Sequence, residues 1–221
     1  MTDFKSRSDR WFFSGMGTLL AAMIFAGFVP TFFARDAGLP PLSAAQRLHG
    51  LTGTAWLALF VVQAWLVVAG RREWHRRLGA LGGLLAVAFG LGGFGVIAAV
   101  EARHAYDSVG TFAAHAYANG APTAAFVAFV LLGAWWRAHA AAHKRLMLLA
   151  AIALLPPGTG RLFSHLGLSD LNLPVYYAVM CVPALYDLAI QRRIHPASLW
   201  GAAALAAIEL STDEWLAAIG S

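Results

Sequence analysis

Residues 78–100 read LGALGGLLAVAFGLGGFGVIAAV, a run that contains no charged side chain. At about 1.5 Å of rise per residue, a helix of this length crosses the roughly 30 Å hydrocarbon core of a bilayer. Charged residues lie immediately outside the run: His75-Arg76-Arg77 precedes it and Glu101 follows it. The run therefore predicts a membrane-spanning helix.

The rest of the chain repeats this pattern. Hydrophobic residues make up 59% of the 221 residues and charged residues only 12%, which is too apolar for an ordinary soluble domain. We predict an all-α polytopic membrane helix bundle of about seven transmembrane helices, with six as the alternative, and a single integral membrane domain over residues 1–221. The predicted spans are Trp11–Phe33, Leu48–Ala69, Leu78–Val100, Thr111–Trp136, His143–Gly160, Pro174–Ile190 and Pro196–Leu210.

Two of the predicted spans contain features that interrupt a helix. Pro156-Pro157-Gly158 removes backbone donors and predicts a kink or an end of the fifth span near one membrane surface. The seventh span is short and alanine-rich, and Ser211-Thr212-Asp213-Glu214 after it has the pattern of a capping box. We therefore expect the seventh span to insert only in part, with a separate short helix after it.

The distribution of basic residues predicts the orientation. With the N-terminus inside, 12 of the 16 lysines and arginines fall in cytoplasmic segments, as the positive-inside rule requires. This predicts a bacterial inner (cytoplasmic) membrane protein with a cytoplasmic N-terminus, and the lipid bilayer as its surroundings. The basic residues lie in short clusters between apolar runs, which argues against a nucleic-acid partner.

The eight histidines divide between the two membrane surfaces. His49, His104, His115 and His165 fall on the outer side, and His75, His139, His143 and His195 fall on the inner side. His75-Arg76-Arg77-Leu78 and His143-Lys144-Arg145-Leu146 both open a predicted span, 68 residues apart, which indicates a weak internal repeat.

Four of these histidines lie on successive spans and alternate between outer and inner sides. A b-type haem needs two imidazole ligands from facing helices, an apolar slot and cations near its propionates. This placement resembles the transmembrane cytochrome b561 family over roughly residues 48–160. The resemblance implies haem b and electron transfer across the bilayer. The candidate metal ligands are His49, His75, His115 and His143, with Arg47 and Arg161 as cofactor-binding cations.

A simpler interpretation of the same residues stays open. Histidines flanked by arginine and lysine at helix ends are common interfacial anchors that need no cofactor. The alternative function is then a non-enzymatic membrane protein, either a transporter or an assembly partner for other membrane proteins in a larger complex.

The second predicted span carries a polar stripe inside the membrane. His49, Gly53, Trp56, Phe60 and Gln63 recur at steps of three and four residues and so share one helix face. The amide of Gln63 is expected to find a partner on a neighbouring helix. A quinone headgroup is a second candidate for contact with this face.

Other chemistry finds less support. Cys181 is the single cysteine, which excludes an intrachain disulfide. Glu101, His104 and Asp107 have a spacing that could align metal ligands, but hydrated loops commonly carry such charges. His139 and His143 have no accompanying carboxylate, so we do not predict a metal hydrolase.

A second resemblance rests on local sequence and covers nearly the whole chain. The segments that carry it are Ala26-Gly27-Phe28, His49-Gly50, Trp56 with Gln63, Gly70-Arg71, His75-Arg76-Arg77-Leu78-Gly79, and His143-Lys144-Arg145-Leu146-Met147-Leu148. They look like a group of uncharacterised bacterial multi-pass membrane proteins. This resemblance implies an inner-membrane location and leaves the activity open.

Overall fold

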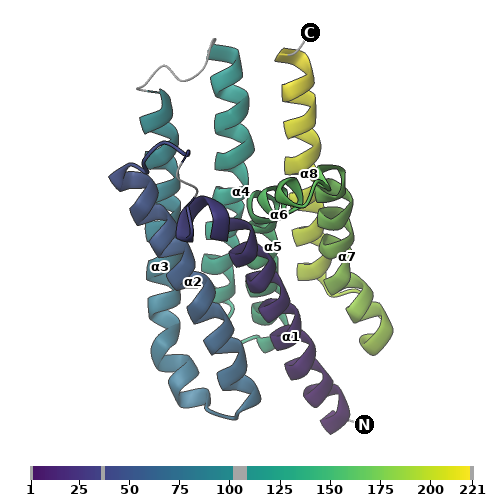
Figure 1. The fold of residues 1–221 in the computed structure, drawn as a ribbon. Coiled ribbons are helices and arrows are strands. Elements are labelled where there is room, and N and C mark those ends of the chain that lie inside the picture. Colours follow the sequence, from purple (N-terminus) through teal and green to yellow (C-terminus); the bar gives the residue numbers. More distant parts are fainter. Residues whose placement is uncertain (1, 36–37, 102–108, 220–221) are drawn as a thin grey trace.

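The protein folds into a bundle of helices, seen in a computed structural model (Figure 1). The structure describes the backbone of residues 2–35, 38–101 and 109–219, and side chains within 7–35, 38–100 and 112–212. Within these ranges it contains helices and no strands, as the sequence predicts. The elements are α1 (Thr2–Phe28), the π-helix η1 (Val29–Phe33), α2 (Ala44–Val68), α3 (Arg72–Glu101), α4 (Val109–Trp135), α5 (Ala140–Ala153), α6 (Leu155–His165), the 3-10 helix η2 (Ser169–Leu171), α7 (Asn172–Gln191) and α8 (Pro196–Ile219).

The predicted number of seven spans is not confirmed. Five segments of the described chain are long and apolar enough to cross a membrane: Arg7–Phe33, Ala44–Val68, Arg72–Val100, Phe112–Trp135 and Ser169–Gln191. The pair α5 and α6 makes a sixth if it is counted as one broken span. The protein therefore has several apolar helices that suit a multi-pass membrane protein, with five or six candidate spans.

The break between α5 and α6 lies where the sequence predicts it. The two helices meet at Leu154 with a bend of 42°. Pro156 and Pro157 occupy the first turn of α6, where their missing N–H groups cost nothing, but they cannot extend the hydrogen-bond ladder of α5. The prolines therefore end one helix and start the next.

The capping box expected at Ser211 is wrong. Residues 211–214 lie inside α8, which continues to Ile219. The hydroxyls of Ser211 and Thr212 bond back to the carbonyls of Ala207 and Ile208, at 2.6 and 2.8 Å, so they leave the backbone N–H groups to the helix. A capping box instead opens α2, where Ser43 and Gln46 satisfy each other's backbone N–H groups.

The centre of the bundle is α5. Every residue from Leu148 to Ala153 is buried, on all sides of the helix, because α1, α4, α7 and α8 pack around it. Large apolar side chains cover much of the outside, and Leu91 and Trp135 are 70% and 79% exposed. Such a surface suits contact with lipid.

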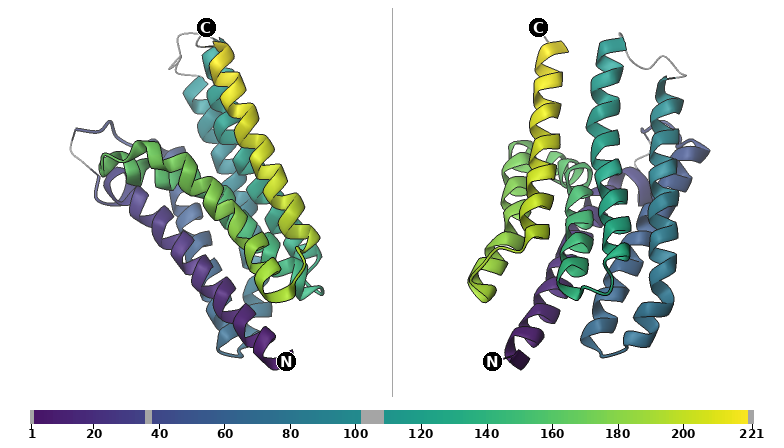
Figure 2. Two further views of the ribbon diagram at one scale, coloured as in Figure 1. Left: turned by 90° about the vertical axis from the view of Figure 1, so that its right-hand side faces the viewer. Right: turned by 180° about the vertical axis from the view of Figure 1, so that it is seen from behind.

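The connections with basic residues lie at one end of the bundle. The α2–α3, α4–α5 and α7–α8 connections all lie at the end where the N-terminus lies, and the C-terminus lies at the opposite end (Figures 1 and 2). We call these the basic end and the far end. At the far end α3, α4 and α8 extend beyond α1, α6 and α7 (Figure 2).

Candidate functional site

Two of the predicted ligands, His75 and His143, come together at the basic end. His75 lies in the first turn of α3 and His143 in the first turn of α5. Their ring centroids are 6.0 Å apart and the ring planes cross at 85°. Both residues are half-buried. The fold thus pairs two imidazoles that are 68 residues apart in the chain.

Each of these imidazoles is anchored by a backbone carbonyl of the preceding helix. His75 Nδ1 lies 3.2 Å from the carbonyl oxygen of Gln63, and His143 Nδ1 lies 2.8 Å from that of Gly133. A carbonyl oxygen only accepts, so each Nδ1 carries the proton and donates it. In the neutral imidazole, Nε2 then holds a free lone pair.

The two anchors support the internal repeat. In the α2–α3 hairpin and again in the α4–α5 hairpin, the histidine that opens the second helix binds back to the last turns of the first. The two four-residue motifs therefore play matching structural roles.

Gln63 lies beside this pair, and its predicted partner on a neighbouring helix is confirmed. Its Nε2 donates to the carbonyl oxygen of His75 at 3.1 Å. Its Oε1 is buried and has no hydrogen-bond partner in the described structure, which is an uncommon and costly state for a buried acceptor. The stripe also continues into the core, where Trp56 stacks on Phe60 at 5.2 Å and meets the ring of Phe126 edge-on at 4.7 Å. Trp56 thus packs between helices.

An ionic network adjoins the histidine pair. Arg145 donates from Nε to both carboxylate oxygens of Asp187 at 3.0 Å, and both side chains are fully buried. Asp187 also accepts from the Ser198 hydroxyl at 2.6 Å and from the His195 backbone N–H at 3.1 Å. Asp187 thus pairs with a basic residue from the start of another helix.

A second ion pair in this network was not predicted. Lys144 pairs with Asp9 of α1, and Asp9 also accepts from the hydroxyl of Tyr186 at 2.8 Å. The only sequence hint was an aspartate among the basic residues that precede the first apolar run. Nearby, burial together with Arg145 and Lys144 lowers the pKa of His195 below its usual value.

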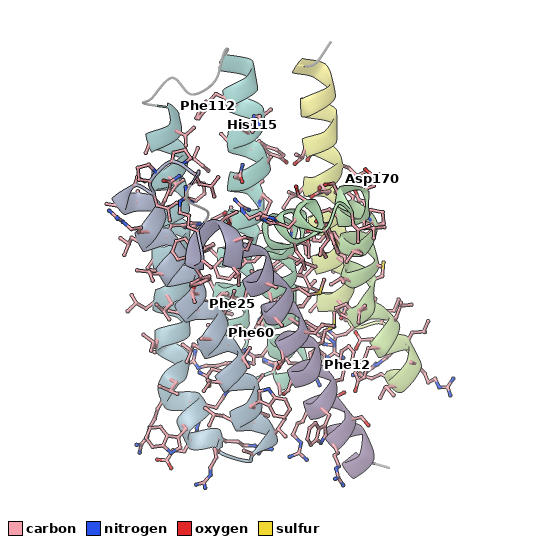
Figure 3. The ribbon with its side chains drawn as sticks, viewed as in Figure 1. Phe12, Phe25, Phe60, Phe112, His115 and Asp170 are labelled. Carbon is pink, nitrogen blue, oxygen red and sulfur yellow. The ribbon has the colours of Figure 1, made fainter. Side chains whose placement is uncertain are left out.

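At the far end, a cavity of about 710 Å³ lies between the helices. Its lining includes the predicted residues His49, His115 and Arg161, together with Arg35, Gln46, Asn119 and Glu209. Figure 3 shows His115 on the upper part of α4. The two outer histidines thus share one cavity, while Arg47 is exposed on α2 and is not among its lining residues. Arg35, which sequence reasoning passed over, takes the place expected for Arg47.

His49 is fixed in a notch of α3. Its ring stacks on Phe89 with centroids 4.2 Å apart, and its Nδ1 lies 3.1 Å from the Phe89 carbonyl oxygen. A Cβ on Gly93 would lie 3.2 Å from His49 Cε1, which is tighter than most real contacts. The glycine therefore makes room for the imidazole.

A clustered metal site was not found in the described residues. No group of three or more histidine, cysteine, aspartate or glutamate side chains there is arranged to hold a metal ion. The triplet Glu101, His104 and Asp107 lies outside the described side chains. This search concerns sites with three or more ligands, whereas a haem iron held by two histidines takes only two ligands from the protein.

Comparisons with models of known protein families, with curated proteins and with solved structures found no match for this chain. The functional argument therefore rests on the site itself.

Proposed function

We propose that the protein is a multi-pass membrane redox protein that binds b-type haem between His75 and His143. The observation that carries the proposal is the close, near-perpendicular approach of these two imidazoles at 6.0 Å, with each Nδ1 held by a backbone carbonyl.

The spacing suits two ligands of one metal. With metal–nitrogen bonds of about 2 Å and roughly 1 Å from nitrogen to ring centre, two imidazoles on opposite sides of a metal have centroids about 6 Å apart. Metal-ligating histidines almost always donate their second ring N–H to a carbonyl or carboxylate, which fixes the tautomer and aims the other nitrogen. His75 and His143 both have that support from α2 and α4.

The surroundings also supply cations for the propionates that a haem carries. Arg76 and Arg137 are exposed at the same end and carry positive charges that propionates can meet. A bound haem supplies one-electron transfer between ferric and ferrous iron.

Absorption spectroscopy of the detergent-purified protein tests this proposal. Cells supplied with haem should yield a protein with a Soret band and, on reduction by dithionite, a sharp α-band. His75→Ala and His143→Ala should each lose this spectrum. His139→Ala is the matched control, because His139 is exposed at the same end and its side chain caps no helix. A colourless wild-type protein would contradict the proposal.

A ligand exchange separates ligation from a merely structural role. In His143→Met the thioether can replace the imidazole, and His/Met ligation raises the reduction potential of haem. We therefore expect His143→Met to keep a low-spin spectrum with a higher midpoint potential. Loss of haem from His143→Ala without any rescue by methionine would point to a structural role.

The number of haems distinguishes one centre from two. The inner pair alone predicts one haem per chain. A second centre at His49 and His115, as the sequence suggested, remains a prediction, and two haems per chain by pyridine haemochrome analysis would support it.

The membrane and its orientation are part of the same proposal. The connections rich in arginine and lysine lie at the basic end (Figure 1), and such segments resist translocation. We propose that this end faces the cytoplasm of a bacterial cell and that the protein lies in the inner membrane. Quinone and other membrane proteins remain candidate electron partners.

The far-end cavity favours a second candidate function. A volume of about 710 Å³ falls within the range of ligand pockets. It supports the alternative of a non-enzymatic protein that binds or transports a lipid-soluble molecule, or assists assembly of a larger complex. A protein without haem that still retains a ligand in this cavity would favour this alternative.

A further inference from the structure

We propose that the far-end cavity is a binding site for a phospholipid whose headgroup carries net negative charge. This inference does not depend on the haem proposal, because the residues that line the cavity include neither His75 nor His143.

Most of the cavity wall is suited to acyl chains. Apolar side chains from α1, the π-helix, α2 and α3 line it, among them Ile24, Phe28, Phe32, Leu57, Phe89 and Ile97. Such a wall contacts acyl chains by van der Waals packing, as apolar helix surfaces in a membrane do. The wall thus selects a ligand with a hydrocarbon tail.

Arg161 places a fixed positive charge at one side of the cavity. Its guanidinium lies over the ring of Phe28, with Cζ 4.6 Å from the centroid, and its Nη1 donates to the carbonyl oxygen of Pro157 at 2.6 Å. The aromatic ring and the carbonyl hold the group in position without cancelling its charge. The other N–H donors of the guanidinium are available to a ligand.

Arg35 brings a second guanidinium to the same cavity. It donates to the carbonyl oxygens of Thr31, at 2.6 Å, and of Pro40. Its Nε and the Thr31 hydroxyl oxygen are buried and have no hydrogen-bond partner in the described structure. The guanidinium of Arg35 therefore keeps donor capacity that the described protein does not use.

Among the described residues that line the cavity, the charges do not balance. In the part of the chain that the structure describes, the ion pairs do not include Arg35 or Arg161. Glu209 of α8 also lines the cavity, so its described lining holds two guanidinium groups and one carboxylate. A phosphodiester would neutralise the remaining charge and accept bidentate hydrogen bonds.

A second hollow gives the headgroup its place. A depression of about 420 Å³ adjoins the cavity and shares Thr31, Pro156, Pro157 and Arg161 with it. Gly160, Ser164 and His165 complete its lining, and the last two are exposed. In this arrangement the phosphate lies at Arg161, the headgroup in this hollow and the acyl chains in the cavity.

Native mass spectrometry tests the site. The protein is reconstituted in vesicles that contain equal parts of phosphatidylglycerol and phosphatidylcholine. The vesicles are dissolved in a mild detergent, the protein is freed of detergent in the mass spectrometer, and the lipids that stay bound to it are identified. We expect wild type to retain phosphatidylglycerol in preference to phosphatidylcholine. Arg161→Gln and Arg35→Gln should each reduce that retention by about tenfold, the effect of losing one charge-assisted hydrogen bond.

The control is Arg47→Gln, which removes an exposed arginine from the same end of the bundle but not from the cavity; it should retain lipid like wild type. Ala116→Phe, which fills part of the cavity, should expel the lipid while the circular dichroism spectrum stays helical. Equal retention of both lipids by wild type, unchanged retention by Arg161→Gln and Arg35→Gln, or a haem bound to His49 and His115 would each overturn the proposal.

Discussion

Arg145 and Asp187 form a fully buried charged contact inside a mainly apolar helix bundle. Arg145 comes from α5, the most buried helix, and Asp187 from α7, and neither side chain is accessible. Breaking such a pair leaves one charge without a partner in a medium that solvates it poorly, which typically costs about 3–5 kcal/mol. The pair therefore ties α7 to the centre of the bundle.

This pair gives a prediction about stability. Arg145→Met and Asp187→Leu should each lower the free energy of unfolding by about 3–5 kcal/mol, whereas the double variant should lose less than either one alone, because no isolated charge remains. Unfolding followed by circular dichroism in micelles measures this. Glu73→Gln, which breaks the exposed pair with Arg77, is the control and should change stability by less than about 1 kcal/mol. Additive losses in the double variant would contradict the interpretation.

The role of a single residue was predictable from the sequence where its neighbours along the helix decide that role. Gln63 lies in an apolar span, so its need for a partner on another helix followed from its position. Arg35 was missed because its role depends on the chain turning back through the π-helix to bring it to the cavity. The sequence carries no local pattern for that approach.

The helices α1 and α6 approach one another through two glycines. A Cβ on Gly27 would lie 1.9 Å from the carbonyl oxygen of Gly158, and a Cβ on Gly158 would lie 2.7 Å from Cα of Ile24. Neither backbone can yield without moving its whole helix. The broken span therefore depends on small residues for its contact with α1, as close helix crossings in membranes usually do.

We predict that Gly158→Ala destabilises the protein by forcing α1 and α6 apart, with a loss on the order of 2 kcal/mol or more. Gly15→Ala is the matched control in α1, because nothing lies within 4 Å of its Cβ position; alanine there should be neutral or stabilise by up to about 1 kcal/mol. Thermal unfolding of both variants in detergent measures the difference. Equal melting temperatures of the Gly158→Ala and Gly15→Ala variants would contradict the close contact between α1 and α6.

At this scale, the sequence predicted element types better than element ends. The Pro156-Pro157 break was predicted because proline acts locally. The extension of α8 through Ser211 was not, since Ser-Thr-Asp-Glu fits both a helix start and a helix interior, and packing on α4 and α5 is not visible in the sequence. Tertiary contacts decided between the two.

Across the whole molecule, the arrangement of the helices gives the basic end and the far end different chemistry. The basic end holds the histidine pair and both ion pairs of the network, and the far end holds the cavity with Arg35 and Arg161. The alternation of histidines along the sequence predicted two levels. It could not predict that His75 and His143 would meet ring to ring, because that depends on how α3 and α5 are rotated.

The orientation prediction is tested by labelling. In a Cys181→Ala background, Arg71→Cys lies in the α2–α3 connection and Ser169→Cys lies at the start of η2 near the other end of α7. A membrane-impermeant maleimide should label Ser169→Cys in cells with a permeable outer membrane, and Arg71→Cys only after the inner membrane is opened. The reverse pattern would place the basic end outside and contradict the positive-inside argument.

The central claim is that His75 and His143 ligate one haem, and electron paramagnetic resonance of the air-oxidised protein tests it most directly. Near-perpendicular axial imidazole planes, as the 85° angle indicates, leave two iron d orbitals almost equal in energy and give a strongly anisotropic low-spin signal. We predict that signal in wild type and His139→Ala, and its loss in His75→Ala and His143→Ala. A high-spin signal in wild type, or no haem iron at all, would contradict the account.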